Sequence, residues 1–201
     1  MPNDTPAFDH IGKRYDESFV ERAAQVAEGD WLIEQLPRGS RVLDLGVGSG
    51  LPTAKQLIDA GMDVVGIDES AVMVALAEEQ APGGTYRLGD LRSFDGEYDA
   101  VVAFFSLLML SKADIEATIQ RAKRHLTGPR LLLISMVQGD FDAFPVNFLG
   151  AATTVSAYPP DKLRQVVTDA GFDVLEFQDL EAVAEPGRVE VQLFVRAKAR
   201  D

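Results

Sequence analysis

The chain has 201 residues, which is enough for one domain with a sizeable core. Its 46% hydrophobic and 25% charged residues are ordinary for a folded protein, and 32 acidic against 19 basic residues give a formal net charge of −13. This charge repels the phosphates of nucleic acids and anionic lipid headgroups, so neither is an expected partner.

The composition also limits the chemistry. The absence of cysteine excludes disulfides and thiolate metal sites, and only two histidines argue against a histidine metal centre, so no metal is expected. The polar start of the chain lacks the features of a signal peptide, and the longest apolar run is too short to span a bilayer. We therefore expect a cytoplasmic protein of 201 residues in a single domain.

Helical and strand patterns alternate along the chain. The apolar spacing predicts helices over residues 17–36 and 51–60, and further helices that begin at Ser70, at Ser111 and near Pro160. Seven strands are predicted over residues 41–45, 63–67, 85–88, 98–104, 130–136, 172–177 and 189–197. Residues 138–157 fit neither period and are interpreted as an insertion after the fifth strand.

This order predicts an α/β fold with a Rossmann-like, seven-stranded, mostly parallel sheet and helices on both faces. Only an acidic loop containing Pro186-Gly187 joins the last two predicted strands. Because no helix lies between them, they can pair directly, and the last strand is expected to be antiparallel.

The most informative stretch is a glycine-rich turn between the first strand and the next helix. Glycines stand at 46, 48 and 50, and Asp44 precedes them by two positions. The glycines could simply tighten the turn, or they could let a ligand approach the backbone at a helix N-terminus. A dinucleotide site would need G-x-G-x-x-G, but position 51 is leucine.

Two further acidic residues follow predicted strands. Asp68 ends the second strand, where a carboxylate can accept both hydrogen bonds of a ribose diol or can cap the next helix. Asp90 follows the third strand. Because parallel strands share their carboxyl edge, both side chains are expected near the glycine-rich turn.

Together, Asp44, the three glycines, Asp68, Asp90 and the segment Tyr98–Phe104 resemble the class I S-adenosylmethionine (SAM)-dependent methyltransferases. The stretch from Phe8 to Phe19 resembles the segment F/Y-D-x-x-A-x-x-Y-D-x-x-F of many small-molecule methyltransferases. The resemblance implies an N-terminal helical lid over residues 1–38, with Tyr15 folded over the cofactor. It also implies a turn that holds the methionine part of SAM and an acidic residue, Asp90, that receives the adenine amino group. The implied cofactor-binding residues are Tyr15, Asp44, Gly46, Val47, Gly48, Gly50, Asp68, Glu69, Met73, Asp90, Leu91 and Phe104.

The implied function is methyl transfer from SAM to an O, N or C atom of a small molecule. A sulfonium methyl group is already activated, so catalysis can rest largely on positioning, and a general base is optional. His10, in the lid, and Tyr158 are the candidate catalytic residues. Side chains expected to meet a largely apolar acceptor are Phe105, Leu107, Met136, Phe141, Phe144 and Phe148, although these could also close the core. Two other functions stay open, a SAM-binding cyclase or rearrangement enzyme and an NAD(P)-dependent oxidoreductase.

Overall fold

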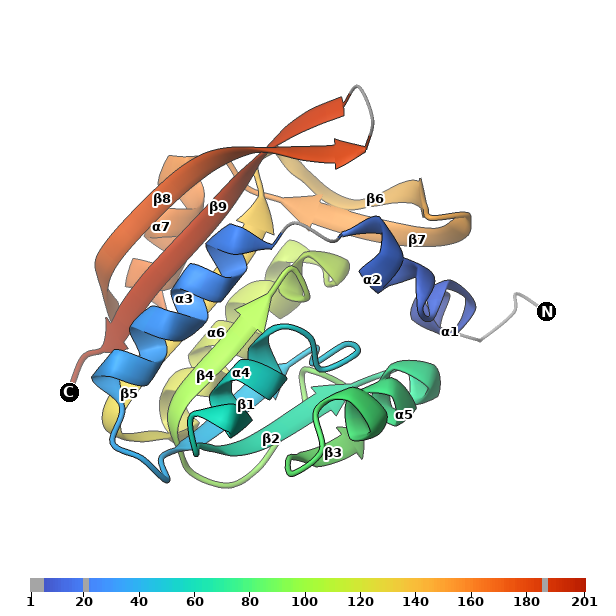
Figure 1. Ribbon diagram of the computed structural model, residues 1–201. Coiled ribbons are helices and arrows are strands. Elements are labelled where there is room, and N and C mark those ends of the chain that lie inside the picture. The colour runs from blue at the N-terminus through green and yellow to red at the C-terminus, as the bar shows by residue number, and fades with distance from the viewer. Residues whose placement is uncertain (1–5, 20–21, 186–187) are drawn as a thin grey trace.

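The computed structural model describes residues 6–19, 22–185 and 188–201. A seven-stranded sheet with the order β3-β2-β1-β4-β5-β9-β8 forms its centre, and β6 and β7 form a separate two-stranded sheet (Figure 1). The strands are β1 (Arg41–Leu45), β2 (Asp63–Asp68), β3 (Thr85–Leu88), β4 (Tyr98–Phe104), β5 (Leu126–Val137), β6 (Phe141–Phe148), β7 (Ala151–Ala157), β8 (Phe172–Glu185) and β9 (Arg188–Ala199).

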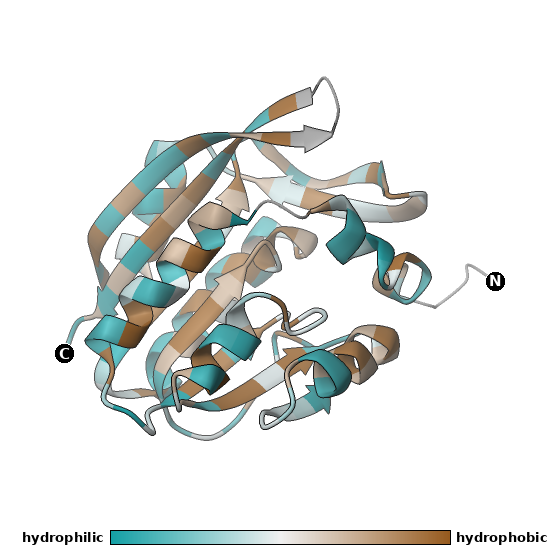
Figure 2. Cartoon of the chain, viewed as in Figure 1, coloured by the Kyte–Doolittle hydropathy of each residue, from teal (hydrophilic) through white to brown (hydrophobic). Residues whose placement is uncertain are grey.

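Helices pack on both faces of the large sheet. The helices are α1 (Ala7–Ile11), α2 (Arg14–Ser18), α3 (Ala23–Gln35), α4 (Thr53–Asp59), α5 (Ala71–Gln80), η1 (Leu107–Met109), α6 (Lys112–His125) and α7 (Pro160–Asp169). Alternate residues of a strand face opposite sides, and β4 shows this clearly. Ala100 and Val102 pack with the α3–α4 side, whereas Val101 and Ala103 pack with the α6–α7 side. Figure 2 shows hydrophobic residues along the central strands and hydrophilic residues on the outer surfaces of helices.

Most predicted elements are confirmed. β1, β3 and β4 have the predicted bounds. Ser70 and Ser111 cap their helices, because their hydroxyl groups accept hydrogen bonds from the backbone nitrogens of Met73 (3.1 Å) and Asp114 (3.2 Å). β9 runs antiparallel to both β5 and β8, so the last strand is the reversed one, as predicted.

Three predicted segments differ from the structure. Residues 17–36 do not form one helix: α2 ends at Ser18 and α3 begins at Ala23, with residues 20–21 outside the described part. The prediction of an acidic loop after residue 177 is wrong, because residues 178–185 continue β8 and pair with β9. Pro186 and Gly187 lie outside the described residues. The segment 138–157 lies between β5 and α7, where an insertion was predicted, but it contains the β6–β7 hairpin, for which no strands were predicted.

The sheet topology determines where a ligand can bind. β1 pairs in parallel with β2 on one side and with β4 on the other, so the strand order reverses at β1. In open α/β sheets the crevice at the carboxyl ends of such strands is the usual ligand site. No helix of the described residues is long and apolar enough to cross a membrane.

Candidate functional site

The glycine-rich turn follows β1 and is held against β2. The backbone nitrogens of Gly46 and Val47 both donate to the carbonyl oxygen of Ile67, at 2.8 and 3.1 Å. Gly46 has a φ of +77°, and a Cβ added there would lie 2.2 Å from the Cβ of Ser106. Gly48 has a φ of +55°, but a Cβ added there would meet nothing within 4 Å. Gly46 therefore allows close packing, whereas Gly48 borders open space.

Asp68 lies beside this open space at the end of β2. One carboxylate oxygen accepts a hydrogen bond from the Gly48 nitrogen (2.9 Å), and the other accepts one from the Ser70 nitrogen (3.0 Å). Burial raises the pKa of Asp68 to about 6, although both amide hydrogen bonds act in the opposite direction. The structure thus places a poorly solvated carboxylate at the turn, as the position of Asp68 predicted.

Asp44 lies behind the turn, within β1. It is 4% exposed, and burial together with the nearby charge of Asp68 raises its pKa to about 7. Its side chain is not among those that line the cleft. Any influence of Asp44 on a ligand would therefore be electrostatic or act through the turn, rather than by lining the cavity.

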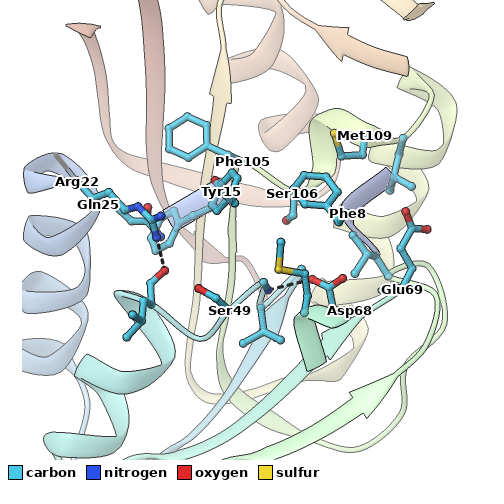
Figure 3. Close-up of a pocket in the computed structure, with 18 residues that line it drawn as sticks. Phe8, Tyr15, Arg22, Gln25, Ser49, Asp68, Glu69, Phe105, Ser106 and Met109 are labelled. Carbon is cyan, nitrogen blue, oxygen red and sulfur yellow. Dashed lines mark hydrogen bonds between the residues drawn. The ribbon is translucent and has the colours of Figure 1, made fainter. Parts of the chain in front are cut away.

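The cleft opens above the turn and encloses about 760 Å³ of space between atoms, including its open mouth. Figure 3 shows its lining residues, which come from the N-terminal helices, the glycine-rich turn, the end of β2 and the segment after β4. They are Phe8, Tyr15, Arg22, Gln25, Gly46, Val47, Gly48, Ser49, Leu51, Asp68, Glu69, Met73, Leu91, Phe104, Phe105, Ser106, Met109 and Leu110.

Arg22 lies at one end of the cleft and holds several parts of the chain together there. Its guanidinium donates to the carbonyl oxygens of Phe19 (2.6 Å) and Leu51 (2.5 Å) and to the carboxylate of Asp16 (2.7 Å). The same group lies 5.0 Å from the centre of the Tyr15 ring. Arg22 thus ties the N-terminal segment to the glycine-rich turn while its cation borders the cavity.

Ser49 adds a polar group at this end. It is 2% exposed, and its hydroxyl oxygen has no hydrogen-bond partner among the described residues. Gln25 also lines the cleft and donates from its amide nitrogen to the hydroxyl of Thr53 (2.8 Å). A buried hydroxyl without a partner is costly, so a ligand atom that hydrogen-bonds to Ser49 would be favoured. Figure 3 shows Arg22, Gln25 and Ser49 on the same side of the cavity.

Aromatic side chains form the N-terminal wall of the cleft. The rings of Phe8 and Tyr15 are 5.8 Å apart, and Phe19 stacks on Phe148 of β6 at 5.9 Å. Burial raises the pKa of the Tyr15 phenol, while the charge of Arg22 opposes this shift. The phenol therefore stays protonated near neutral pH and can act as a hydrogen-bond donor.

The N-terminal helix α1 is also fixed to α5. The hydroxyl of Ser70 donates to the Asp9 carboxylate at 2.5 Å, and the Val72 nitrogen donates to it at 3.3 Å. This contact holds Phe8 over the cleft. That the segment acts as a lid stays a prediction.

The cleft brings together many of the predicted site residues. Those that line it are Tyr15, Gly46, Val47, Gly48, Asp68, Glu69, Met73, Leu91, Phe104 and Phe105. Gly50 does not line the cleft, because its Cα faces α5: an added Cβ would lie 2.9 Å from that of Ala81. The residues with ligand-facing side chains therefore come mainly from the turn and the strand ends.

Asp90 is oriented differently from the prediction. Its carboxylate binds the Arg92 guanidinium, with the shortest contact at 2.6 Å, and that hydrogen bond lowers its pKa. Arg92 also reaches Asp114 at 3.4 Å. Asp90 is not among the residues that line the cleft, whereas its neighbour Leu91 is.

The structure does not bring either candidate catalytic residue to the cleft. His10 is exposed, because α1 turns Phe8 and the buried Ile11 inward and leaves His10 on its outer side. Tyr158 is buried in the core on the α6–α7 side. Its hydroxyl lies 3.2 Å from the carbonyl oxygen of Lys112 and 3.4 Å from a carboxylate oxygen of Glu116.

Most of the expected acceptor-facing residues also lie elsewhere. Leu107 and Met136 are fully buried in the core, as their alternative interpretation allowed. Phe141 and Phe144 pack on each other at 5.9 Å on β6, and Phe144 is 57% exposed. Phe148 does not line the cleft but supports its aromatic wall. Of this set, only Phe105 lines the cavity.

Sequence reasoning missed Arg22, Gln25 and Ser49 at one end of the cleft and Met109 and Leu110 at the other. Ser49 stands between Gly48 and Gly50 in the glycine-rich turn, and this position could have indicated that it lines the ligand site. Arg22 follows the N-terminal aromatic segment, but its contact with Leu51 spans 29 residues and no local pattern indicates it.

Comparisons with known proteins agree with this geometry. Residues 42–128 match the family described as a methyltransferase domain. A demethylmenaquinone methyltransferase of Beutenbergia cavernae is 36% identical over 115 residues, which are 53% of this chain and 47% of that protein. Residues 42–128 thus form a SAM-dependent methyltransferase domain with the class I fold. It spans about half the length of the curated relatives that it matches.

Solved structures show the same methyltransferase fold. Magnesium protoporphyrin IX methyltransferase from Synechocystis, with bound S-adenosylhomocysteine (SAH), superimposes with a TM-score of 0.72 and 20% identity, covering 96% of this chain and 97% of that one. The [4+2]-cyclase SpnF superimposes with a TM-score of 0.70 and 20% identity, covering 97% of each chain. At these identities the likeness to the solved structures concerns the fold alone.

Proposed function

We propose that the protein transfers a methyl group from SAM to an O, N or C atom of a small organic molecule with a largely apolar body. The observation that carries this proposal is the open position above Gly48 beside the carboxylate of Asp68, at the carboxyl ends of β1 and β2. Side chains at Gly48 would fill this space, which is consistent with a ligand that lies against the backbone.

The lining residues fit the parts of SAM. Asp68 would accept hydrogen bonds from the ribose hydroxyls, and Leu91 and Met73 would contact the adenine ring. Arg22 would hold the methionine carboxylate with Ser49, whose buried hydroxyl otherwise lacks a partner. An adenine contact with Asp90 would require its carboxylate to turn from Arg92.

When bound, SAM supplies a methyl group that its sulfonium already activates. The chain's own contribution is then positioning. Phe104, Phe105 and Met109 give the cleft an apolar end after β4, which would exclude water and seat an apolar acceptor. The Tyr15 hydroxyl, at the aromatic wall, would hydrogen-bond to the cofactor rather than remove a proton, since its pKa is raised.

Calorimetric titration with SAM, SAH and NADPH tests the cofactor. We expect SAM and SAH to bind with one-to-one stoichiometry and NADPH to show no heat of binding. Binding of NADPH without binding of SAM or SAH would contradict the proposal and favour an oxidoreductase.

A second candidate is a SAM-binding cyclase or rearrangement enzyme, which the shared fold with SpnF supports. Once an acceptor is found, the two activities are separated by the amount of SAH formed. Methyl transfer produces one SAH for each product molecule, whereas a rearrangement produces none.

We also propose a small-molecule substrate, rather than nucleic acid or a membrane, and a cytoplasmic location. The net charge of −13 supports the exclusion of polyanionic partners. A nucleic-acid binding assay at low salt tests this part of the proposal. Retention of DNA or RNA by the protein would contradict it.

A further inference from the structure

The ends of β8 and β9 project beyond the rest of the large sheet. The pairing of β9 with β5 ends at Gln192 and Val137, and the Val191 carbonyl oxygen still accepts a hydrogen bond from the Gln138 nitrogen (2.8 Å). Residues 188–190 of β9 pair with β8. We call residues 181–185 and 188–191 the β8–β9 arm. Figure 1 shows the arm extending toward the side of the molecule that carries α2, β6 and β7. This is the carboxyl edge of the parallel strands, where the cleft lies.

One face of β9 looks toward the cleft. Successive residues of a strand alternate between its faces, so Glu190, Gln192 and Phe194 lie on the same side. The Phe194 ring contacts the ring of Phe105, at 5.6 Å, and Phe105 lines the apolar end of the cleft. Phe194 also packs with the core on the α3–α4 side of the sheet. The arm therefore continues the acceptor end of the cleft outward from Phe105.

Glu190 is the charged group on this face. Its carboxylate accepts a hydrogen bond from the Gln192 amide at 3.0 Å, and the side chain is only partly exposed. Glu190 lies four residues from Phe194 on the same face of β9, which directs its side chain to the side of the sheet on which Phe194 meets Phe105. In agreement with this position, its charge contributes to the raised pKa of Tyr15. Asp179 and Glu181, on the other face of β8, add to the negative charge of this region.

The charge and position of Glu190 favour one kind of acceptor. A partly buried carboxylate binds a cation more strongly than an exposed one, and it repels a carboxylate or phosphate. The apolar end beside Phe105 and Met109 suits an aromatic or aliphatic body. We propose that Glu190 is a specificity-determining residue that binds a protonated amino group of the acceptor while the acceptor's apolar body lies against Phe105. This inference rests on the proposed function.

Arylalkylamines with tethers of one to four carbons test the inference, each compared with the carboxylic acid of the same length. Tryptamine and indole-3-propionate form one such pair. Binding is measured by calorimetry on the protein alone and on the protein saturated with SAH. We expect at least one amine to bind about tenfold or more tightly than its matched acid, as a single charge-assisted contact would give.

Two variants locate the preference. Glu190→Gln is expected to remove it, and Glu181→Gln, which makes the same change on the opposite face of the arm, is expected to keep it. The inference is overturned if no amine binds better than its acid, or if Glu190→Gln keeps the preference.

SAH titrations of the same proteins separate the two proposals. We expect both variants to bind SAH as the unchanged protein does, since neither residue is among those that line the cleft. Failure of SAH to bind the unchanged protein would refute the proposed function. Normal SAH binding without any preference for amines would refute only the role of Glu190.

Discussion

Substitution of Asp68 by asparagine should have opposite effects on the fold and on cofactor binding. Burial raises the pKa of Asp68 from 3.8 to about 6, so the ionised carboxylate destabilises the folded state at neutral pH by roughly 3 kcal/mol. Below pH 3.8 the carboxyl group is protonated in both states and the folded state keeps this roughly 3 kcal/mol of stability; the stability is lost as the pH rises through about 6. Asparagine removes the charge. Its side-chain oxygen can accept from Gly48 or Ser70, but the other backbone N–H loses its acceptor, at a cost of about 1–3 kcal/mol.

The variant should therefore be about as stable as the unchanged protein at pH 7, or more stable by up to about 2 kcal/mol, with a weaker pH dependence between pH 4 and 6. SAH affinity should nevertheless fall by about 1–3 kcal/mol, because the ribose hydroxyls lose a charged acceptor. Urea unfolding measures the first effect and calorimetry the second. Asp63→Asn, at the exposed start of the same strand, is the matched control. Unchanged SAH affinity in Asp68→Asn would refute the assignment of this carboxylate to the cofactor.

Four further predictions concern other residues of the cleft and of the core. Gly48→Val should abolish SAH binding while circular dichroism shows a retained fold, because the added side chain enters the open space and a β-branched residue strains the turn at a φ of +55°; normal binding would contradict the placement of the ligand. Arg22→Met should weaken SAH binding about tenfold or more in calorimetry through loss of a charge-assisted contact, and an equal affinity would show that the guanidinium serves only the protein. Glu28→Gln should lower the free energy of unfolding by about 3–5 kcal/mol in urea, because the 4%-exposed carboxylate pairs with the Arg196 guanidinium at 2.8 Å; a change below 1 kcal/mol would contradict this. Asp44→Asn should reduce the loss of stability that accompanies a rise in pH from 4 to 7, since burial raises the pKa of Asp44 to about 7, and an unaltered pH profile of unfolding would speak against that shift.

The sequence predicted the parts of the fold that depend on local patterns. The buried strands around the turn have short apolar runs, and the serine caps at 70 and 111 mark helix starts directly. The turn and Asp68 could be located because glycine spacing and strand ends are visible in the sequence. The extended β8–β9 pairing could not be predicted, because its acidic residues resemble a loop until a partner strand is known.

The side-chain arrangement of the cleft was harder to predict. Asp90 stands at the expected position in the chain, but its carboxylate is paired with Arg92 and does not line the cleft. Met136 lies near the end of β5 and Phe105 directly after β4, yet only Phe105 lines the cleft. The face on which a strand side chain lies depends on the register of the strand. Arg22 reaches the turn through a contact distant in sequence.

A crystal structure of the protein grown with SAH would test the central claim most directly. The account predicts electron density for SAH in the cleft, with its ribose hydroxyls within hydrogen-bond distance of the Asp68 carboxylate and its carboxylate group next to Arg22 and Ser49. SAH bound at another place, or an empty cleft at a saturating concentration of SAH, would contradict the account.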